Sequence, residues 1–194
     1  MQKKLGIFTA LTMLMFIMSG CSNPLQSAEA NAVLLVGQAQ AISSFIDANN
    51  SVIYTTRVEG EYKITADKKT AYIPLSLANK LIQSYVIYDI STAKPTAVQP
   101  VIKFGDTRAE IWSKTNQSEI TIDGTTIPAH YGGAYTIGEE AFVDNIVVIS
   151  DQLWHQIEGE ATSIKIAMCN DARKIETQRS EELTSIFIST HGNN

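Results

Sequence analysis

The sequence predicts a single α+β domain built on a mixed β-sheet, preceded by a cleaved export signal. Three observations lead to this prediction. The N-terminus carries a short basic and then apolar run at residues 3–18, two later segments at 71–82 and 145–157 each join a short strand to an amphipathic helix, and an Asp-Gly pair at 123–124 lies between apolar residues at strand spacing. Strand-to-helix units combined with hairpins are typical of mixed sheets.

The N-terminal run has the layout of a signal peptide. Lys3 and Lys4 precede the apolar stretch 5–18, which ends at the small residues Ser19 and Gly20. A transmembrane helix needs roughly 20 apolar residues to cross the hydrocarbon layer, so this stretch is too short to span a membrane. We therefore expect residues 1–20 to be absent from the mature chain.

A cysteine follows the small residues directly, in Met18-Ser19-Gly20-Cys21. This tetrapeptide resembles the lipobox of bacterial lipoproteins, with Met18 where that family usually has Leu. The resemblance implies transfer of a diacylglyceryl group, with acyl chains such as palmitate, to the Cys21 thiol and cleavage before Cys21. Because two acyl chains exceed the single chain that binds only marginally, we expect a lipid-anchored protein on the extracytoplasmic face of the cell membrane.

The composition of the chain without its predicted signal peptide indicates which classes of partner it can bind. Without residues 1–20 the chain has 174 residues, with 13 Lys or Arg against 20 Asp or Glu, which gives a net charge near −7. Nucleic acids require clustered positive charge, so a nucleic-acid partner is not expected. If Cys21 carries the lipid, Cys169 has no partner within the chain, and its apolar surroundings favour a buried inert thiol over a reactive one.

The chain divides into four parts: a lipoprotein signal peptide at 1–20, a lipidated tether at 21–31, an α+β domain at 32–190 and a disordered tail at 191–194. Within the domain, Glu59-Gly60 is expected to turn one strand into the next, and Asp123-Gly124 favours a two-residue hairpin turn. Strands are expected at 32–37, 52–58, 62–64, 86–90, 100–104, 109–114, 163–169 and 186–188, and the two strands of this hairpin at 119–127. Helices are expected at about 39–48 and 171–182.

The two strand-to-helix modules share a design without being a sequence repeat. In the first, a strand around 71–73 leads into a helix whose N-terminus Ser76 can cap, with Leu77 and Leu81 on its apolar face. In the second, a strand at 145–149 leads into a helix capped by Ser150 or Asp151.

The segment 72–81 also carries a family resemblance. Its sequence Tyr-Ile-Pro-Leu-Ser-Leu-Ala-Asn-Lys-Leu looks like the hydrophobic-Pro-Leu-Ser-x-Ala-x-x-Leu stretch in the extracytoplasmic domains of FtsX-like permeases, ABC transporters of the macrolide-exporter type. The second module, 144–157, resembles a strand-to-helix segment of the same domains. The chain lacks the four transmembrane helices of such a permease, so the resemblance implies an external-domain fold and a permease as partner. Size and layout also resemble small uncharacterised lipoproteins of Gram-positive bacteria.

Motifs for catalysis are missing from the sequence. The histidines, His130, His155 and His191, do not have the His-Glu-x-x-His spacing of a zinc site, and no Gly-x-Ser-x-Gly pentapeptide is present. We therefore expect no metal, no cofactor and no enzymatic activity.

The sequence offers one candidate contact surface. Tyr131, Gly132, Gly133 and Tyr135 form its most glycine-dense point, and together with Trp154 they are proposed as contact residues because aromatics are enriched at binding hot spots. The alternative is a flexible turn flanked by two packing aromatics. The favoured function is a non-enzymatic binding or accessory protein that works with an ABC transporter permease. A small-ligand receptor is the second hypothesis, and a cell-envelope enzyme is the third.

Overall fold

The computed structural model describes residues 31–65, 67–104, 107–122, 124–138, 143–176, 178, 180 and 182–188. The predicted signal peptide, the predicted lipidation site Cys21 and the predicted tail at 191–194 lie outside the described residues.

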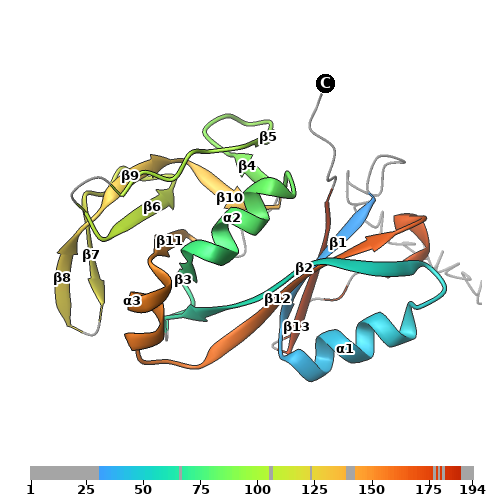
Figure 1. Cartoon of the computed structure of the whole chain (residues 1–194). Helices are drawn as coiled ribbons and strands as arrows, with labels where there is room; N and C mark the ends of the chain where they lie inside the picture. The colour runs from blue at the N-terminus through green and yellow to red at the C-terminus, as the bar shows by residue number, and fades with distance from the viewer. Residues whose placement is uncertain are drawn as a thin grey trace, which may run out of the picture.

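The described chain forms one α+β fold around an eight-stranded mixed sheet, as the sequence predicts (Figure 1). The strand order is β13-β1-β12-β2-β3-β11-β6-β9, and a three-stranded sheet β10-β4-β5 and the hairpin β7-β8 pack beside it. Among the described residues no helix is long and apolar enough to cross a membrane. The elements are β1 Ala32–Gly37, α1 Ala39–Ala48, β2 Ile53–Ile64, β3 Thr70–Pro74, α2 Leu75–Gln83, β4 Ile87–Asp89, β5 Thr96–Val98, β6 Ala109–Ser113, β7 Glu119–Ile122, β8 Thr125–Pro128, β9 His130–Gly133, β10 Tyr135–Ile137, β11 Asn145–Ile149, α3 Asp151–Gln156, β12 Ala161–Cys169, the 3₁₀ turn Ala172–Lys174 and β13 Leu183–Ile188.

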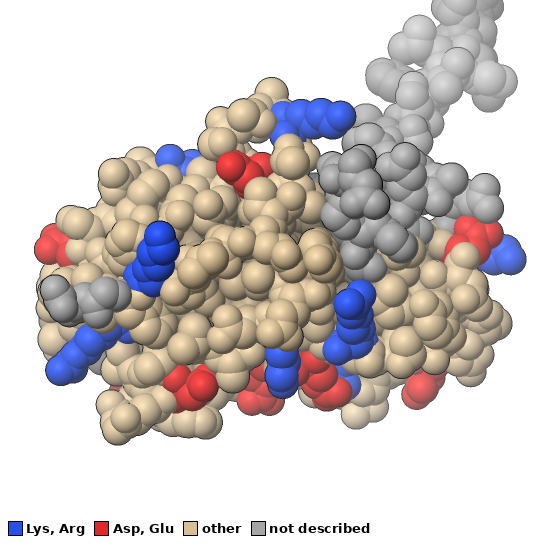
Figure 2. Space-filling view, turned by 45° about the horizontal axis from the view of Figure 1, so that its top comes forward, with Lys and Arg blue, Asp and Glu red and all other residues tan. Residues whose placement is uncertain are grey.

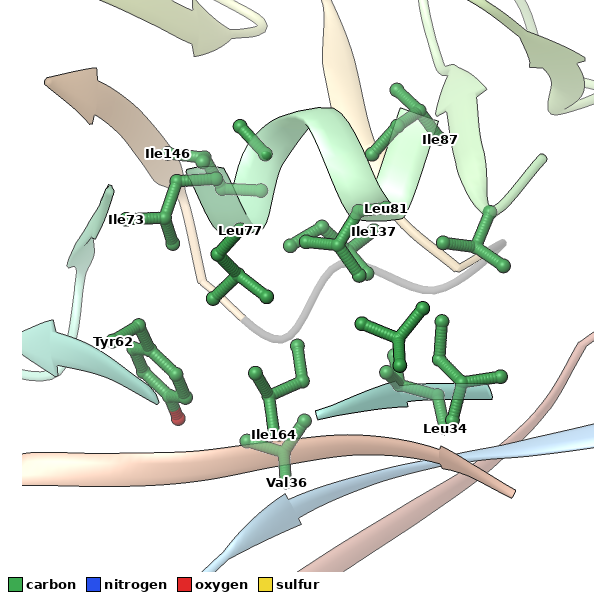
Figure 3. Close-up of a cluster of buried hydrophobic side chains, with 14 of the residues drawn as sticks. Leu34, Val36, Tyr62, Ile73, Leu77, Leu81, Ile87, Ile137, Ile146 and Ile164 are labelled. Carbon is green, nitrogen blue, oxygen red and sulfur yellow. The ribbon is translucent and has the colours of Figure 1, made fainter. Parts of the chain in front are cut away.

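Three apolar clusters hold the layers together. The largest lies between the eight-stranded sheet on one side and α2 with the three-stranded sheet on the other, and Leu34, Leu81 and Ile137 are among its members (Figure 3). On the opposite face of the sheet, α1 covers β1 and β12 in the second cluster, and α3 with the β7-β8 hairpin covers β3, β11 and β6 in the third. The sheet is therefore covered on both faces, by different elements at its two ends.

The alternation of side chains along the strands explains this layering. In β1, Leu34 and Val36 enter the largest cluster, while Val33 and Leu35 enter the second. Because successive side chains point to opposite faces, a strand covered on both sides must be apolar throughout. The continuous apolar run at 32–37 correctly predicted such a strand.

Several local signals were interpreted correctly. The helix at 39–48 and the strand that precedes each module helix are present, and the last strand, predicted at 186–188, extends over Leu183–Ile188. Ile122 pairs with Thr125 across a two-residue turn in which Gly124 has a φ of +76°. A positive φ costs glycine little, so the Asp-Gly signal predicted this turn for the right reason.

The predicted turn at Glu59-Gly60 is wrong, because β2 runs through it as one strand. A Cβ on Gly60 would lie 2.6 Å from Leu77 Cδ1 of α2. A glycine inside a strand often marks a close approach of another element, and here that element is α2. The same residue type that suggested a turn serves helix packing.

The predicted helix at 171–182 is also wrong. The described part of this segment contains only the 3₁₀ turn Ala172–Lys174, after which Ile175 is buried in the second cluster. The segment 100–104 is not a strand, whereas β5, β9 and β10 form short strands that were not individually predicted. Strands of three or four residues carry too little periodicity to be found from sequence.

Candidate functional site

The two strand-to-helix modules, far apart in sequence, lie side by side. β3 and β11 pair in parallel from Thr70 opposite Asn145 to Pro74 opposite Ile149. From these carboxyl ends α2 leaves to one face of the sheet and α3 to the other. In open α/β sheets, such a divergence at the carboxyl ends of parallel strands creates a crevice where ligands commonly bind.

A crevice is present here, and β2 forms its other wall. β2 pairs with β3 only at Lys63 opposite Tyr72 and Ile64 opposite Ala71, after which the two strands diverge. The crevice has a volume of about 280 Å³ and is lined by residues 59–61 of β2, by Pro74 and the first turns of α2, and by residues of α3. We call it the edge crevice.

The beginnings of α2 and α3 meet in the edge crevice. α3 is capped as predicted, since Ser150 Oγ accepts a hydrogen bond from the Leu153 N–H at 3.2 Å. The predicted capping role of Ser76 is wrong, because the N-cap of α2 is Pro74. Instead, Asp151 Oδ1 accepts hydrogen bonds from the Ser76 N–H at 3.2 Å and the Ser76 hydroxyl at 2.8 Å. The first residue of one helix therefore satisfies a backbone donor of the other.

Trp154 is a buried residue of α3 that lines the edge crevice. Only 8% of its surface is exposed, and its indole N–H donates to the Tyr72 carbonyl at 2.9 Å. Lys63 Nζ lies 4.7 Å from the centre of the indole ring and donates to the Trp154 carbonyl at 3.1 Å. These contacts hold α3 against β2 and β3, so the Trp154 indole has a structural role.

The outer edge of β2 is free along the stretch from Tyr54 to Glu61. This stretch pairs with β12 on one side, and within the described chain no backbone hydrogen bond reaches its other side. Six of its eight residues are exposed, Tyr54 to 59%. Lys165 of β12 forms an ion pair with Glu59 at 2.8 Å. The structure thus leaves an open strand edge in the interior of an eight-stranded sheet.

The four glycine-loop residues of the predicted contact surface lie elsewhere, on β9 and β10. A Cβ on Gly132 would lie 2.5 Å from Glu110 Oε1, so only glycine fits there without a shift. Glu110 is 1% exposed, and its carboxylate accepts hydrogen bonds from the Lys103 N–H at 2.5 Å and the Trp112 indole N–H at 2.7 Å. Sequence reasoning missed Glu110, although a charged residue inside the apolar run 109–113 was a signal for a buried polar contact.

The two tyrosines are half-buried and make structural contacts. The Tyr131 hydroxyl donates to the Ser113 carbonyl at 3.1 Å. The Tyr135 ring meets the Trp112 ring edge-on at 6.0 Å, and burial raises the pKa of its hydroxyl. Tyr135 packs against the largest cluster and Trp154 belongs to the third, on the other face of the sheet. The structure therefore separates Trp154 from the other predicted contact residues, whose binding role stays a prediction.

A second hollow lies beside the β7-β8 hairpin. It has a volume of about 580 Å³, with Tyr72, Ile111 and Val147 among its apolar lining residues and hydroxyl, amide and carboxylate side chains around them. Gln117 donates to Asn145 Oδ1, and Asn145 donates to Thr70 Oγ1, both at 3.3 Å. We call it the hairpin pocket.

The described residues contain no candidate metal site and no reactive thiol. Over the described ranges, no three His, Cys, Asp or Glu side chains cluster in a way that could hold a metal ion. Cys169 is buried, and burial raises its thiol pKa to about 11, so the thiol is protonated at neutral pH. A thiolate is the reactive form, which agrees with the predicted inert thiol.

Basic and acidic side chains are interspersed on the face that Figure 2 shows.

Comparison with known proteins identifies the family. The model of an uncharacterised lipoprotein family matches residues 30–189. The chain belongs to this lipoprotein family. A crystal structure from Bacillus anthracis, of a protein provisionally assigned as a lipoprotein, is similar in fold with a TM-score of 0.66 and 18% sequence identity, over 75% of this chain and 87% of that one. Among curated proteins no sequence matches.

The family match and the structural neighbour support some of the sequence predictions and leave others open. Membership in the family supports a membrane-anchored lipoprotein, and the structural neighbour supports the fold. The resemblance to FtsX-like permeases is not shown by either finding and stays a hypothesis.

Proposed function

We propose that this lipoprotein is a membrane-tethered, non-enzymatic binding protein that holds an extended segment of a partner protein at the extracytoplasmic face. The observation that carries the proposal is the free outer edge of β2 from Tyr54 to Glu61. Family membership supports the membrane anchor.

An open strand edge presents unpaired N–H and C=O groups, which form a template for another strand. Partner proteins use such edges by adding a strand, because the main-chain hydrogen bonds provide affinity and side-chain pockets provide specificity. In this chain the edge crevice supplies such a pocket beside residues 59–61. The hydrogen-bonding edge and the side-chain pocket lie together.

The tether limits where the partner can be. Residues 22–31 separate the lipidation site from β1, and ten extended residues span at most about 35 Å. The tether therefore keeps β1 within this distance of the membrane, which suits a partner in the extracytoplasmic part of a membrane protein. The ABC transporter permease expected from the sequence resemblance fits this requirement and is our proposed partner.

Site-specific crosslinking in cells tests the proposal. A photoreactive residue at Thr56, on the free edge, should capture one discrete protein, whereas the same residue at the exposed Gln40 of α1 should not. Identification of the captured protein as a permease supports the proposed partner. If Thr56 and Gln40 give the same pattern of adducts, the β2 edge is not the binding surface.

The anchor has its own test. Cys21→Ala should release the protein from the membrane, because the acyl chains supply the membrane affinity. The measurement is fractionation of cells with and without detergent. Retention of the Cys21→Ala protein in the membrane fraction contradicts the lipid anchor.

The hairpin pocket favours a second candidate function, capture of a small polar ligand. Its volume lies in the range of small-molecule sites, and its lining combines amide and hydroxyl groups with apolar side chains. Screening of sugars and amino acids by thermal shift tests this alternative. A ligand whose stabilisation is lost in Asn145→Ala, and kept in Thr56→Ala, supports it.

A further inference from the structure

We infer that the partner segment is a short extended strand that carries Lys or Arg at every second position. This inference rests on the proposed function, since it concerns the chemistry of the strand that adds to β2. It follows from the orientation of the β2 side chains, some of which face α3 and others α2 across the edge crevice.

The register of β2 fixes these orientations. Between Val58 and Lys63 the pairing with β12 is regular, with Glu59 opposite Lys165 and Glu61 opposite Ser163. Lys63 continues the same side and contacts α3, so Glu59 and Glu61 face the α3 side of the sheet. Gly60 lies on the other side, against α2.

The charges differ between the two sides of the edge crevice. On the α3 side its lining includes the carboxylates of Glu59, Glu61 and Asp151, and on the α2 side it includes Lys80. Of the two carboxylates of β2, Glu59 already has Lys165 as an ion-pair partner. For Glu61 no ion pair is found in the described part of the chain. An added strand places every second side chain on the α3 side, opposite these carboxylates, and opposite charges across strands attract.

The intervening positions of the added strand face α2. There Gly60 is already within close approach of Leu77, and the amino group of Lys80 disfavours another cation. Small uncharged side chains fit this side. The complete pattern is therefore a cation alternating with a small residue.

The strand must also be short. The pairing of β2 with β12 shifts register between Ile166 and Ala167 and again between Met168 and Cys169, so the regular part of the free edge begins at Val58. Such bulges and charged residues protect edges from unspecific pairing. A second copy of the chain, paired over residues 59–61, would place carboxylates opposite carboxylates, which is destabilising. The edge thus favours a basic partner over self-association.

Peptide binding to the full-length lipoprotein in detergent micelles tests the inference by fluorescence anisotropy. The probes are eight-residue peptides with Thr at every second position and Lys, Ser or Glu between. A fourth peptide repeats the Lys sequence with alternate backbone amides N-methylated, which prevents strand pairing. The Lys peptide should bind at least several-fold more tightly than the Ser peptide, the Glu peptide should bind most weakly, and N-methylation should abolish binding.

A matched pair of variants separates local from general attraction, since the chain is acidic overall. Glu61→Gln should weaken binding of the Lys peptide about two- to fivefold, the effect of one cross-strand charge pair, whereas Glu119→Gln on the exposed surface of β7 should leave it unchanged. Equal effects of both variants overturn the inference.

The outcomes also separate this inference from the proposed function. Equal binding of the Lys and Ser peptides, abolished by N-methylation, overturns the basic pattern and leaves strand addition standing. Undiminished binding of the N-methylated peptide overturns strand addition itself, and absence of binding by every peptide overturns both. A dimer in analytical ultracentrifugation that Glu61→Lys alters would show that the occupant of the edge is a second copy.

Discussion

The two strand-to-helix modules reach the same layout by different means. β11-α3 caps its helix with its own Ser150, whereas β3-α2 begins at Pro74 with no side-chain cap and receives the Asp151 carboxylate from the other module. α2 buries Leu77, Ala78 and Leu81, while α3 has only six residues. The comparison teaches that the longer helix is held mainly by apolar packing, whereas the shorter one adds directed hydrogen bonds to the burial of Trp154.

The largest expected effect tests the packing of α2. Leu81→Ala, at a fully buried position, should lower the free energy of unfolding by about 2–5 kcal/mol because it leaves a cavity. Leu153→Ala, at a partly buried position of α3, should cost less. Urea denaturation of both variants measures the difference, and equal losses would contradict the contrast between the modules.

Trp154→Phe tests the directed contacts of α3. It keeps a ring but removes the donor to the buried Tyr72 carbonyl, which should cost about 1–3 kcal/mol. Gln152→Ala, at an exposed position of the same helix, serves as control and should change stability by less than about 0.5 kcal/mol. If thermal unfolding shows the two variants to be equally stable, α3 is held by packing alone.

Gly60→Ala tests the contact between β2 and α2. The added methyl group would meet the buried Leu77 side chain, and overpacking typically costs about 1–3 kcal/mol. Thr56→Ala, at an exposed position on the same strand, provides the matched control. A Gly60→Ala protein as stable as Thr56→Ala would show that α2 can shift away from β2.

The capping contacts should give the smallest effects. Ser150→Ala should cost about 1 kcal/mol through loss of the α3 cap, and Asp151→Ala should cost less because its bonds to Ser76 are exposed. A double-mutant cycle of Asp151→Ala with Ser76→Ala measures the coupling between the modules. Strict additivity of the two substitutions would mean that the modules are coupled only through the sheet.

The features predicted correctly depend on neighbours in sequence. The apolar run at 32–37, the helical spacing at 39–48 and the Asp-Gly turn each carry their signal within a few residues, since strand alternation, helical period and turn geometry are local. The lipid-anchor prediction rests on the same kind of short motif, ending at Cys21, and the family match supports it.

The errors arose where a distant element changed the meaning of a local signal. Gly60 resembled a turn residue, but its role is to admit Leu77. Ser76 resembled a cap, but its partner is Asp151, 75 positions away. The contact surface grouped Trp154 with Tyr135, and the sheet lies between them.

The sequence by itself predicted a signal peptide and a lipobox, and it determined the α+β class, the two modules and the hairpin, because each follows from residue types within one short window. Only the tertiary structure decided that β3 and β11 are parallel neighbours, that β2 diverges from β3, and that Glu59 and Glu61 line a crevice with Asp151. Those features depend on which faces of distant elements bury one another best, and local propensity contains no record of that choice.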